Sequence, residues 1–89
     1  MMQNDWAYLE KYALDNEHLL KQHNDGNRIV FIGDSITEFW ERYDLMFFSQ
    51  NTYINRGISS QTTSQILERF QNDVIDLQPK SVIILAGIN

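Results

Sequence analysis

Three largely apolar runs, separated by segments of helical spacing, constrain the fold of this chain more than any other feature. They cover residues 28–32, 52–54 and 81–86. The first and third are apolar nearly throughout instead of alternating with polar residues, which indicates strands buried on both faces, as in a parallel sheet. Helices between such strands imply right-handed crossovers, so the carboxyl ends of all three strands would share one edge of the sheet.

The segments around these runs have the periodicity of amphipathic helices. We expect helices over residues 5–23, 36–43 and 63–77 and a short helix at 45–48, and Pro79 ends the 63–77 helix. The order α-β-α-β-α-β predicts an α/β fold. The side chains expected in the core are Trp6, Leu9, Ala13 and Leu20 on the first helix, Phe39 and Trp40 on the second, and Ile66, Leu67, Phe70, Val74 and Leu77 on the last.

The composition bounds the class of protein. At 89 residues, 43% hydrophobic and 12% aromatic, the chain is at most one small folded domain. Its net charge of −5 and its scattered Lys and Arg residues argue against a nucleic-acid partner, and no apolar run approaches the ~20 residues of a membrane span. It has no cysteine, and no spacing predicts a metal site or a cofactor. The first residues lack the pattern of a signal peptide, so we expect a cytoplasmic protein unless a leader has been removed.

The third apolar run has no following segment to cover it. Residues 87–89 come directly after it and end the sequence. A three-stranded parallel sheet with an apolar outer strand is incomplete. We therefore interpret residues 1–89 as the amino-terminal portion of a single longer domain. We expect the isolated chain to be poorly stable or to self-associate through the uncovered sheet edge.

The expected carboxyl ends of the strands carry three polar segments that contain glycine: residues 33–35, 55–57 and 87–89. Ligands and reacting groups gather at this edge in open α/β sheets. Acyl transfer by a serine needs an exposed hydroxyl, a base and donors for the oxyanion. Ser35 could supply the hydroxyl and its own N–H, while the Gly57 N–H and the Asn89 side-chain amide could supply further donors.

No base for such a serine is evident. The two histidines, His18 and His23, precede the first strand and lie five residues apart, so they do not share a helical face. Solvated helix residues are the default interpretation of both. Asp34 adjoins Ser35 in sequence and would point elsewhere, so we expect it to hold the loop.

The three polar segments resemble the first three motif blocks of the SGNH (GDSL-type) hydrolases. These blocks are Gly33-Asp34-Ser35, then Gly57 within residues 55–63, then Gly87-Ile88-Asn89, and residues 28–89 are similar throughout to the bacterial acylhydrolase branch of the family. The resemblance implies a flavodoxin-like, three-layer α/β/α fold, of which this chain holds about three strands.

The resemblance also implies a function. It implies hydrolysis of carboxylic esters through an acyl-enzyme, with Ser35 as nucleophile and with the Ser35 N–H, the Gly57 N–H and the Asn89 side chain as the oxyanion hole. The substrates implied are short-chain acyl or acetyl esters, including those of carbohydrates. The family places its base in a later Asp-x-x-His motif, which this chain lacks. We therefore expect the 89-residue chain alone to have negligible activity.

The sequence departs from the family pattern at three places. Ile36 stands for Leu, Ser60 for a frequent second glycine, and Ile88 for the usual Thr. None removes a catalytic group, although Ser60 could stiffen the loop in which it lies.

Several of these residues also have purely structural interpretations. Ser35 with Glu38 forms an S-x-x-E pattern, a capping box that needs no chemistry, and Thr62 with Gln65 is a second such pattern. Gly57 could be a turn glycine, and Asn89 could be a turn residue or a fraying terminus. Arg56 could tie its loop down or attract an anionic group.

The alternative function is a non-catalytic ligand-binding or assembly module on the same kind of sheet. The phosphate-binding loop and the G-x-G-x-x-G dinucleotide motif are both absent. A receiver domain would need an aspartate after the third strand, where this chain has Asn89.

Overall fold

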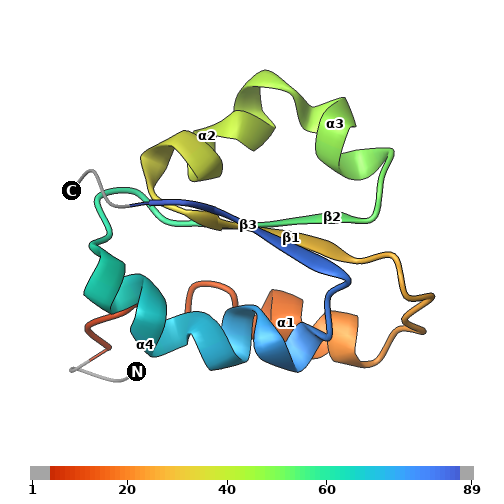
Figure 1. Cartoon of the computed structure of the whole chain (residues 1–89), viewed down its shortest axis with the longest axis horizontal. Coiled ribbons are helices and arrows are strands. Elements are labelled where there is room, and N and C mark those ends of the chain that lie inside the picture. The colour runs from red at the N-terminus through yellow and green to blue at the C-terminus, as the bar shows by residue number, and fades with distance from the viewer. Residues whose placement is uncertain (1–4, 87–89) are drawn as a thin grey trace.

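A three-stranded parallel sheet with helices on both faces makes up the computed structural model, which describes residues 5–86 (Figure 1). The elements in chain order are α1 (Ala13–Leu20), β1 (Ile29–Gly33), α2 (Ser35–Tyr43), α3 (Leu45–Ser49), β2 (Tyr53–Gly57), α4 (Thr63–Asp73), the 3₁₀ turn η1 (Ile75–Leu77) and β3 (Ser81–Leu85). The predicted order of strands and helices is confirmed.

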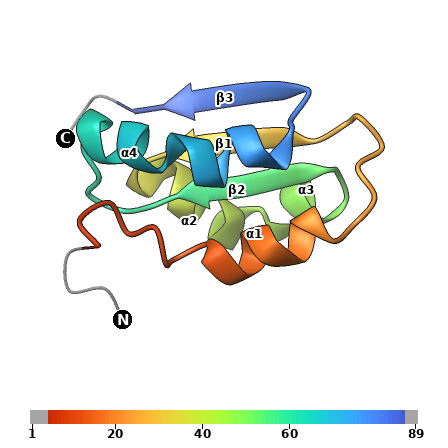
Figure 2. The same cartoon turned by 90° about the horizontal axis from the view of Figure 1, so that it is seen from below.

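The strand order is β2-β1-β3, and both neighbours run parallel to β1. Helices α2 and α3 cover one face of the sheet, while α1 and α4 cover the other (Figures 1 and 2). The structure is therefore the three-layer α/β/α arrangement that the sequence predicts. At the carboxyl edge Gly33 is in register with Gly57 on one side and with Leu85 on the other, which brings the ends of all three strands together.

Side chains alternate between the two faces along β1. Val30 and Ile32 are fully buried towards α4 and join a core with Ile54 and Leu77. Phe31 faces the other way, into a cluster of aromatic rings below α2 and α3. The rings of this aromatic cluster are Phe31, Trp40, Phe47, Phe48 and Tyr53.

The first helix is shorter than predicted. Residues 5–12 form turns instead, because the Asp5 carboxylate accepts hydrogen bonds from the backbone N–H groups of Leu9 and Glu10. Tyr8 has a positive φ of 59°, which interrupts any helix at this point. The expected core positions Trp6, Ala13 and Leu20 are exposed, with Trp6 at 56%.

The turns at residues 5–12 lie against the segment that follows β2. Ala7 is buried, and its carbonyl accepts a hydrogen bond from Gln61 Nε2 at 2.7 Å. The carbonyl of Trp6 accepts one from Gln65 Nε2 at 2.8 Å. We call residues 5–12 the strap, since these bonds hold them along α4.

The last predicted helix also differs from expectation. It breaks after Asp73 into η1, and Leu67, expected in the core, is 73% exposed. Ile66, Val74 and Leu77 are buried as predicted. The buried face of α4 also contains Arg69 and Asp73, two charged residues that were not expected there.

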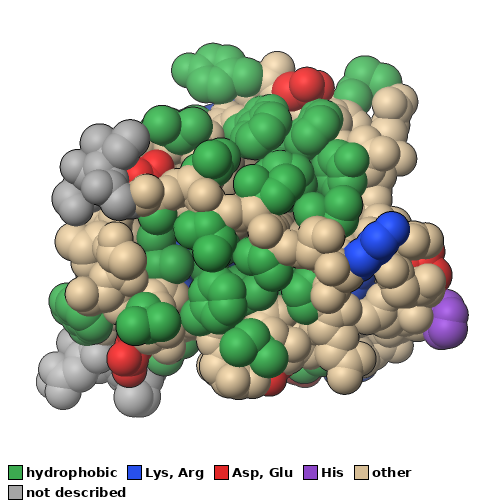
Figure 3. Space-filling view, viewed as in Figure 1, with side chains coloured by type: hydrophobic (Ala, Val, Ile, Leu, Met, Phe, Trp, Pro, Cys, Tyr) green, Lys and Arg blue, Asp and Glu red, His purple; other side chains and the backbone are tan. Residues whose placement is uncertain are grey.

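Strand β3 is an open edge of the sheet. Ile83, Ile84 and Leu85 are each more than a third exposed, which agrees with the expectation that this apolar outer strand is left uncovered among the described residues. Figure 3 shows the β3 side of the molecule, where hydrophobic side chains spread from α2 across β3 to α4. No helix in residues 5–86 is long and apolar enough to cross a membrane.

Candidate active site

Ser35 is the first residue of α2 and comes directly after the turn that ends β1. Asp34 caps this helix, since its Oδ1 accepts a hydrogen bond from the Ile36 N–H at 3.3 Å. The Asp34 N–H in turn donates to the Leu85 carbonyl at 3.4 Å. The predicted structural role of Asp34 is thereby confirmed. It fixes the turn that presents Ser35 at the carboxyl edge of the sheet.

The Ser35 side chain is half-buried, so part of it is accessible from outside. Within residues 5–86, no side-chain hydrogen bond engages its Oγ. Its N–H lies in the first turn of a helix, where backbone donors have no acceptor within the helix. Ser35 also borders an open, mainly apolar hollow along α2, lined by Ile36, Phe39, Trp40 and Tyr43.

The alternative interpretation of Ser35 and Glu38 as a capping box does not hold, because Asp34 is the N-cap of α2. Glu38 Oε1 accepts instead from the N–H and the Oγ of Ser59, at 2.6 and 2.8 Å, and its Oε2 pairs with Lys11 Nζ at 3.2 Å. Burial alone would raise the pKa of Glu38, but the bonds from Ser59 and Lys11 outweigh it and lower the pKa. Glu38 thus ties α2 to the segment after β2. The second predicted box, between Thr62 and Gln65, is present.

Gly57 is the last residue of β2, so it is not a turn glycine. A Cβ at this position would lie 2.2 Å from the Glu38 backbone N, and one at Gly33 would lie 2.2 Å from the Leu85 carbonyl oxygen. Only glycine allows the strands and α2 to approach so closely. The two glycines therefore decide how near α2, and Ser35 with it, lies to the sheet.

The Gly57 N–H already has an acceptor. It donates to Asn55 Oδ1 at 2.8 Å, and Asn55 Nδ2 donates to the Thr37 carbonyl at 2.7 Å. The sequence indicated a polar loop at Asn55 and Arg56, but both residues belong to β2. In the loop beyond, Ser60 has a φ of 63°, in the left-handed region that favours glycine, which is the residue the family often has there.

The site residues predicted from the sequence are thus partly placed. Ser35 follows β1 and Gly57 ends β2 at one edge of the sheet, where Gly33 and Gly57 are in register. Asn89 lies outside the described residues. Arg56 is buried and donates to Asn16 Oδ1 and to the Asn55 carbonyl, so of its two interpretations the structure supports the one in which it ties the chain down.

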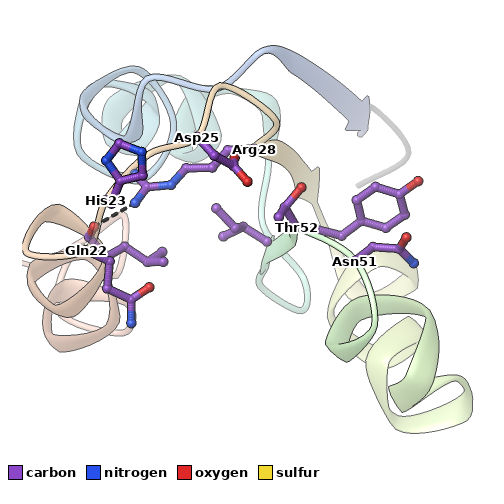
Figure 4. Close-up of a pocket in the computed structure, with 9 residues that line it drawn as sticks. Gln22, His23, Asp25, Arg28, Asn51 and Thr52 are labelled. Atoms are coloured by element: carbon purple, nitrogen blue, oxygen red, sulfur yellow. Dashed lines mark hydrogen bonds between the residues drawn. The ribbon is translucent and has the colours of Figure 1, made fainter.

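Neither histidine lies at the edge that holds Ser35. His23 borders a hollow at the opposite end of the sheet, together with Arg28 and Thr52, as Figure 4 shows. His18 is exposed on α1, which covers the face of the sheet opposite α2 (Figure 1). Both agree with the interpretation of solvated residues. The described residues contain no group of His, Cys, Asp and Glu side chains that could hold a metal ion.

Sequence reasoning missed a group of buried polar residues beneath the same edge. Arg69 and Asp73 are fully buried and form an ion pair at 2.9 Å. The signal was their position, since they fall on the same buried face of α4 as Ile66. Charged residues on a helix usually face solvent, so their identity alone gives no sign of burial.

The chain was compared with protein families and with known proteins. No family model matches the chain. Platelet-activating factor acetylhydrolase IB subunit alpha2 of Homo sapiens, Bos taurus and Rattus norvegicus is 30% identical over 64 residues, which cover 68% of this chain and 28% of that protein.

Two solved structures are similar over almost the whole chain. A protein of Bacteroides fragilis, provisionally named an acylhydrolase, is 47% identical with a TM-score of 0.91, over 98% of this chain and 42% of its own. A GDSL-like lipase of Bacteroides thetaiotaomicron is 46% identical with a TM-score of 0.88, over 94% and 41%. The chain spans less than half the length of each of these relatives. With its fold, its GDS turn at Ser35 and these relatives taken together, the chain belongs to the SGNH (GDSL-type) hydrolase family.

Proposed function

We propose that the chain carries the nucleophile and part of the oxyanion hole of a serine esterase. The observation that carries the proposal is the position of Ser35 at the capped start of α2, with no side-chain partner for its Oγ in residues 5–86. In the proposed reaction, Ser35 Oγ loses its proton to a base and attacks the ester carbonyl, and the alcohol leaves with a proton. Water then hydrolyses the acyl-serine and restores the hydroxyl.

The proposed oxyanion donors are the Ser35 N–H, the Gly57 N–H and the Asn89 side chain. One such donor typically contributes about 3–4 kcal/mol of transition-state stabilisation. The Ser35 N–H is supported by its place in the first helical turn. The role of Gly57 requires the substrate oxygen to replace Asn55 Oδ1, which accepts from the Gly57 N–H here.

The proposed substrates are short-chain acyl or acetyl esters, including esters of carbohydrates. The apolar hollow beside Ser35 supports an ester with an uncharged acyl or alcohol group. The name of the curated relatives, an acetylhydrolase, agrees with an acetyl ester.

The proposed base and its partner belong to an Asp-x-x-His motif outside this chain. Residues 1–89 would then be the amino-terminal portion of one domain, which agrees with a coverage of 42% of the solved relative. We therefore expect the chain alone to show negligible turnover of a short-chain aryl ester.

A hybrid protein tests the proposed function. This chain would replace the segment that it matches in the Bacteroides fragilis relative, whose remaining sequence would complete the domain. We expect the folded hybrid to hydrolyse an aryl acetate and Ser35→Ala to abolish turnover. Ser49→Ala, at an exposed serine in α3, is the matched control and should keep the activity.

Two outcomes would contradict the proposal. One is a hybrid that folds, by circular dichroism, but turns over no ester that the unaltered relative hydrolyses. The other is full activity of the Ser35→Ala hybrid. A folded, inactive hybrid that still binds esters would favour the alternative, a non-catalytic binding module.

We also propose that the isolated chain self-associates through β3. The exposed Ile83, Ile84 and Leu85 on an open strand support this proposal, since such edges pair readily with other chains. Sedimentation at rising concentration should show growing assemblies. A monomer with a sharp, concentration-independent unfolding transition would count against it.

A further inference from the structure

Five polar side chains form a connected network between the sheet and the helices α1 and α4. We call them the buried network. They are Tyr12, Asn16, Arg56, Arg69 and Asp73.

Asp73 is the centre of the buried network and is fully buried. Its Oδ2 accepts from Arg69 Nη1 at 2.9 Å, and its Oδ1 accepts from Asn16 Nδ2 at 2.6 Å. Asn16 Oδ1 in turn accepts from Arg56 Nε at 2.9 Å. One carboxylate thus holds two guanidinium groups, directly and through an amide. Buried charges need such partners, because an unpaired one costs several kcal/mol.

The outer donors of the network bind backbone carbonyl groups of β1 and β2, two of them at the carboxyl ends of these strands. These bonds run from Arg69 Nη2 to Gly33 (3.4 Å), from Arg56 Nη1 to Asn55 (2.8 Å) and from Tyr12 Oη to Gly57 (2.6 Å). The Tyr12 ring also lies below the Arg56 guanidinium, 4.6 Å from ring centroid to Cζ. The two bonds to the last residues of β1 and β2, Gly33 and Gly57, therefore fall at the edge that holds Ser35.

Arg69 has a further link to this edge. Its Nε donates to Gln61 Oε1 at 2.6 Å, and Gln61 lies in the segment that continues from β2. A guanidinium presents its donors in a rigid, planar fork, so one side chain can fix three acceptors relative to one another. Lysine would keep the charge beside Asp73 but lose this geometry.

The amino edge of the sheet has a separate attachment. Arg28 is buried there, and its guanidinium donates to the carbonyl groups of Leu77 and Leu19 at 3.0 and 2.7 Å. It shares no contact with the buried network among the hydrogen bonds of the described residues. The chain therefore offers a matched arginine at each end of the same strands.

We propose that Arg69 and Tyr12 are positioning residues for the nucleophile. By holding the carbonyl groups of Gly33 and Gly57 from below the sheet, they fix the strand ends from which Ser35 and the oxyanion donors are presented. The inference rests on the proposed function only in taking Ser35 as the nucleophile. Neither side chain touches the substrate in this account.

Amide hydrogen exchange on the folded hybrid protein, followed by NMR, tests the proposal. The carboxyl edge is reported by the N–H groups of Ile58, bonded to Gly33, and of Asp34, bonded to Leu85. The amino edge is reported by those of Ile29 and Lys80, bonded to Thr52 and Arg28. The variants are Arg69→Lys and Tyr12→Phe, with Arg28→Lys as the matched control.

We expect both network variants to speed exchange at the carboxyl edge by about tenfold relative to the amino edge. The Ser35 amide resonance should also shift in both. Arg28→Lys should have the reverse effect and leave the Ser35 resonance in place. Equal acceleration at both edges, or none at either, would overturn the proposal.

Two safeguards keep the result decisive. If Arg69→Lys does not fold, Tyr12→Phe still decides, because it removes a single hydroxyl and keeps the ring below Arg56. No readout depends on turnover, so a failure of Ser35 as nucleophile in the hybrid would leave the positioning result unaffected.

Discussion

The two faces of the sheet are stabilised by different chemistry. Below α2 and α3, the aromatic cluster packs edge to face around Phe31, with ring centroids 5.3 Å apart for both Trp40 and Phe48. Over α1 and α4, the buried network connects side chains by directed hydrogen bonds around Asp73. The aromatic cluster packs against α2 through Trp40, while the buried network hydrogen-bonds the ends of β1 and β2.

This difference bears on the site, because Ser35 lies where both kinds of support meet. Its helix packs on the aromatic cluster through Trp40, and the strand before it ends at a carbonyl bonded to Arg69. Hydrophobic packing tolerates changes of shape better than a buried polar network tolerates the loss of one partner. We therefore expect the two faces to respond unequally to conservative substitutions.

The largest effect is expected from Asp73→Asn. The change keeps the shape but leaves two buried guanidinium groups without a carboxylate, which should lower the free energy of unfolding by about 3 kcal/mol. Urea titration of the folded hybrid protein, followed by circular dichroism, measures it. The control is Glu17→Gln, which breaks an exposed pair with Lys21 and should cost less than about 0.5 kcal/mol. Similar losses of unfolding free energy in both variants would contradict a larger contribution of the buried network than of an exposed ion pair.

Gly57→Ala should rank second, at about 1–3 kcal/mol. Its Cβ would meet the Glu38 backbone N at 2.2 Å, so α2 must move away from β2. The amide resonances of α2 should shift along the whole helix. Gly26→Ala is the control, since its Cβ meets nothing within 4 Å and only its φ of 85° is strained. It should leave the resonances of α2 in place.

Phe31→Leu tests the tolerance of the apolar face. The substitution keeps most of the buried apolar surface and loses ring contacts with four neighbours, so we expect a loss of about 1–2 kcal/mol. The same urea titration measures the change. A loss larger than that of Asp73→Asn would reverse the comparison between the two faces.

The smallest effect is expected in the pH dependence of stability, through the contacts of Glu38 with Ser59 and Lys11. The pKa of Glu38 is lowered from its ordinary value of 4.5, so its contribution to stability is complete above that value and is lost as pH falls through the lowered folded pKa. Thermal unfolding from neutral to acidic pH should therefore depend less on pH in Glu38→Gln. Phe31→Leu should keep the pH dependence of the unaltered chain.

Local sequence patterns were enough to predict much of the molecule. Strands β1 and β3 and helix α2 lie within a residue or two of their predicted positions, because apolar runs and helical spacing are local signals. The place of Ser35 at the start of a helix followed from the same signals.

What could not be predicted depends on particular side-chain hydrogen bonds, several of them between residues far apart in the sequence. The strap is not helical because Asp5 bonds the N–H groups of Leu9 and Glu10, and Gln61 bonds it across 54 positions of the chain. Arg69 and Asp73 are buried because Asn16 and the Gly33 carbonyl satisfy them, and neither partner is near in sequence. The bond from the Gly57 N–H to Asn55 Oδ1 was not predicted either, although these residues are only two positions apart.

The strap has a consequence for where the folding unit begins. The motifs of the family start only at residue 28, and a chain shortened to that point would retain every strand and the GDS turn. It would lose Tyr12 from the Gly57 carbonyl, Lys11 from Glu38 and the Ala7 carbonyl from Gln61. Residues that no motif marks are thus the ones that brace the loop after β2, so the boundary of this unit is set by its hydrogen bonds and not by its resemblance to relatives.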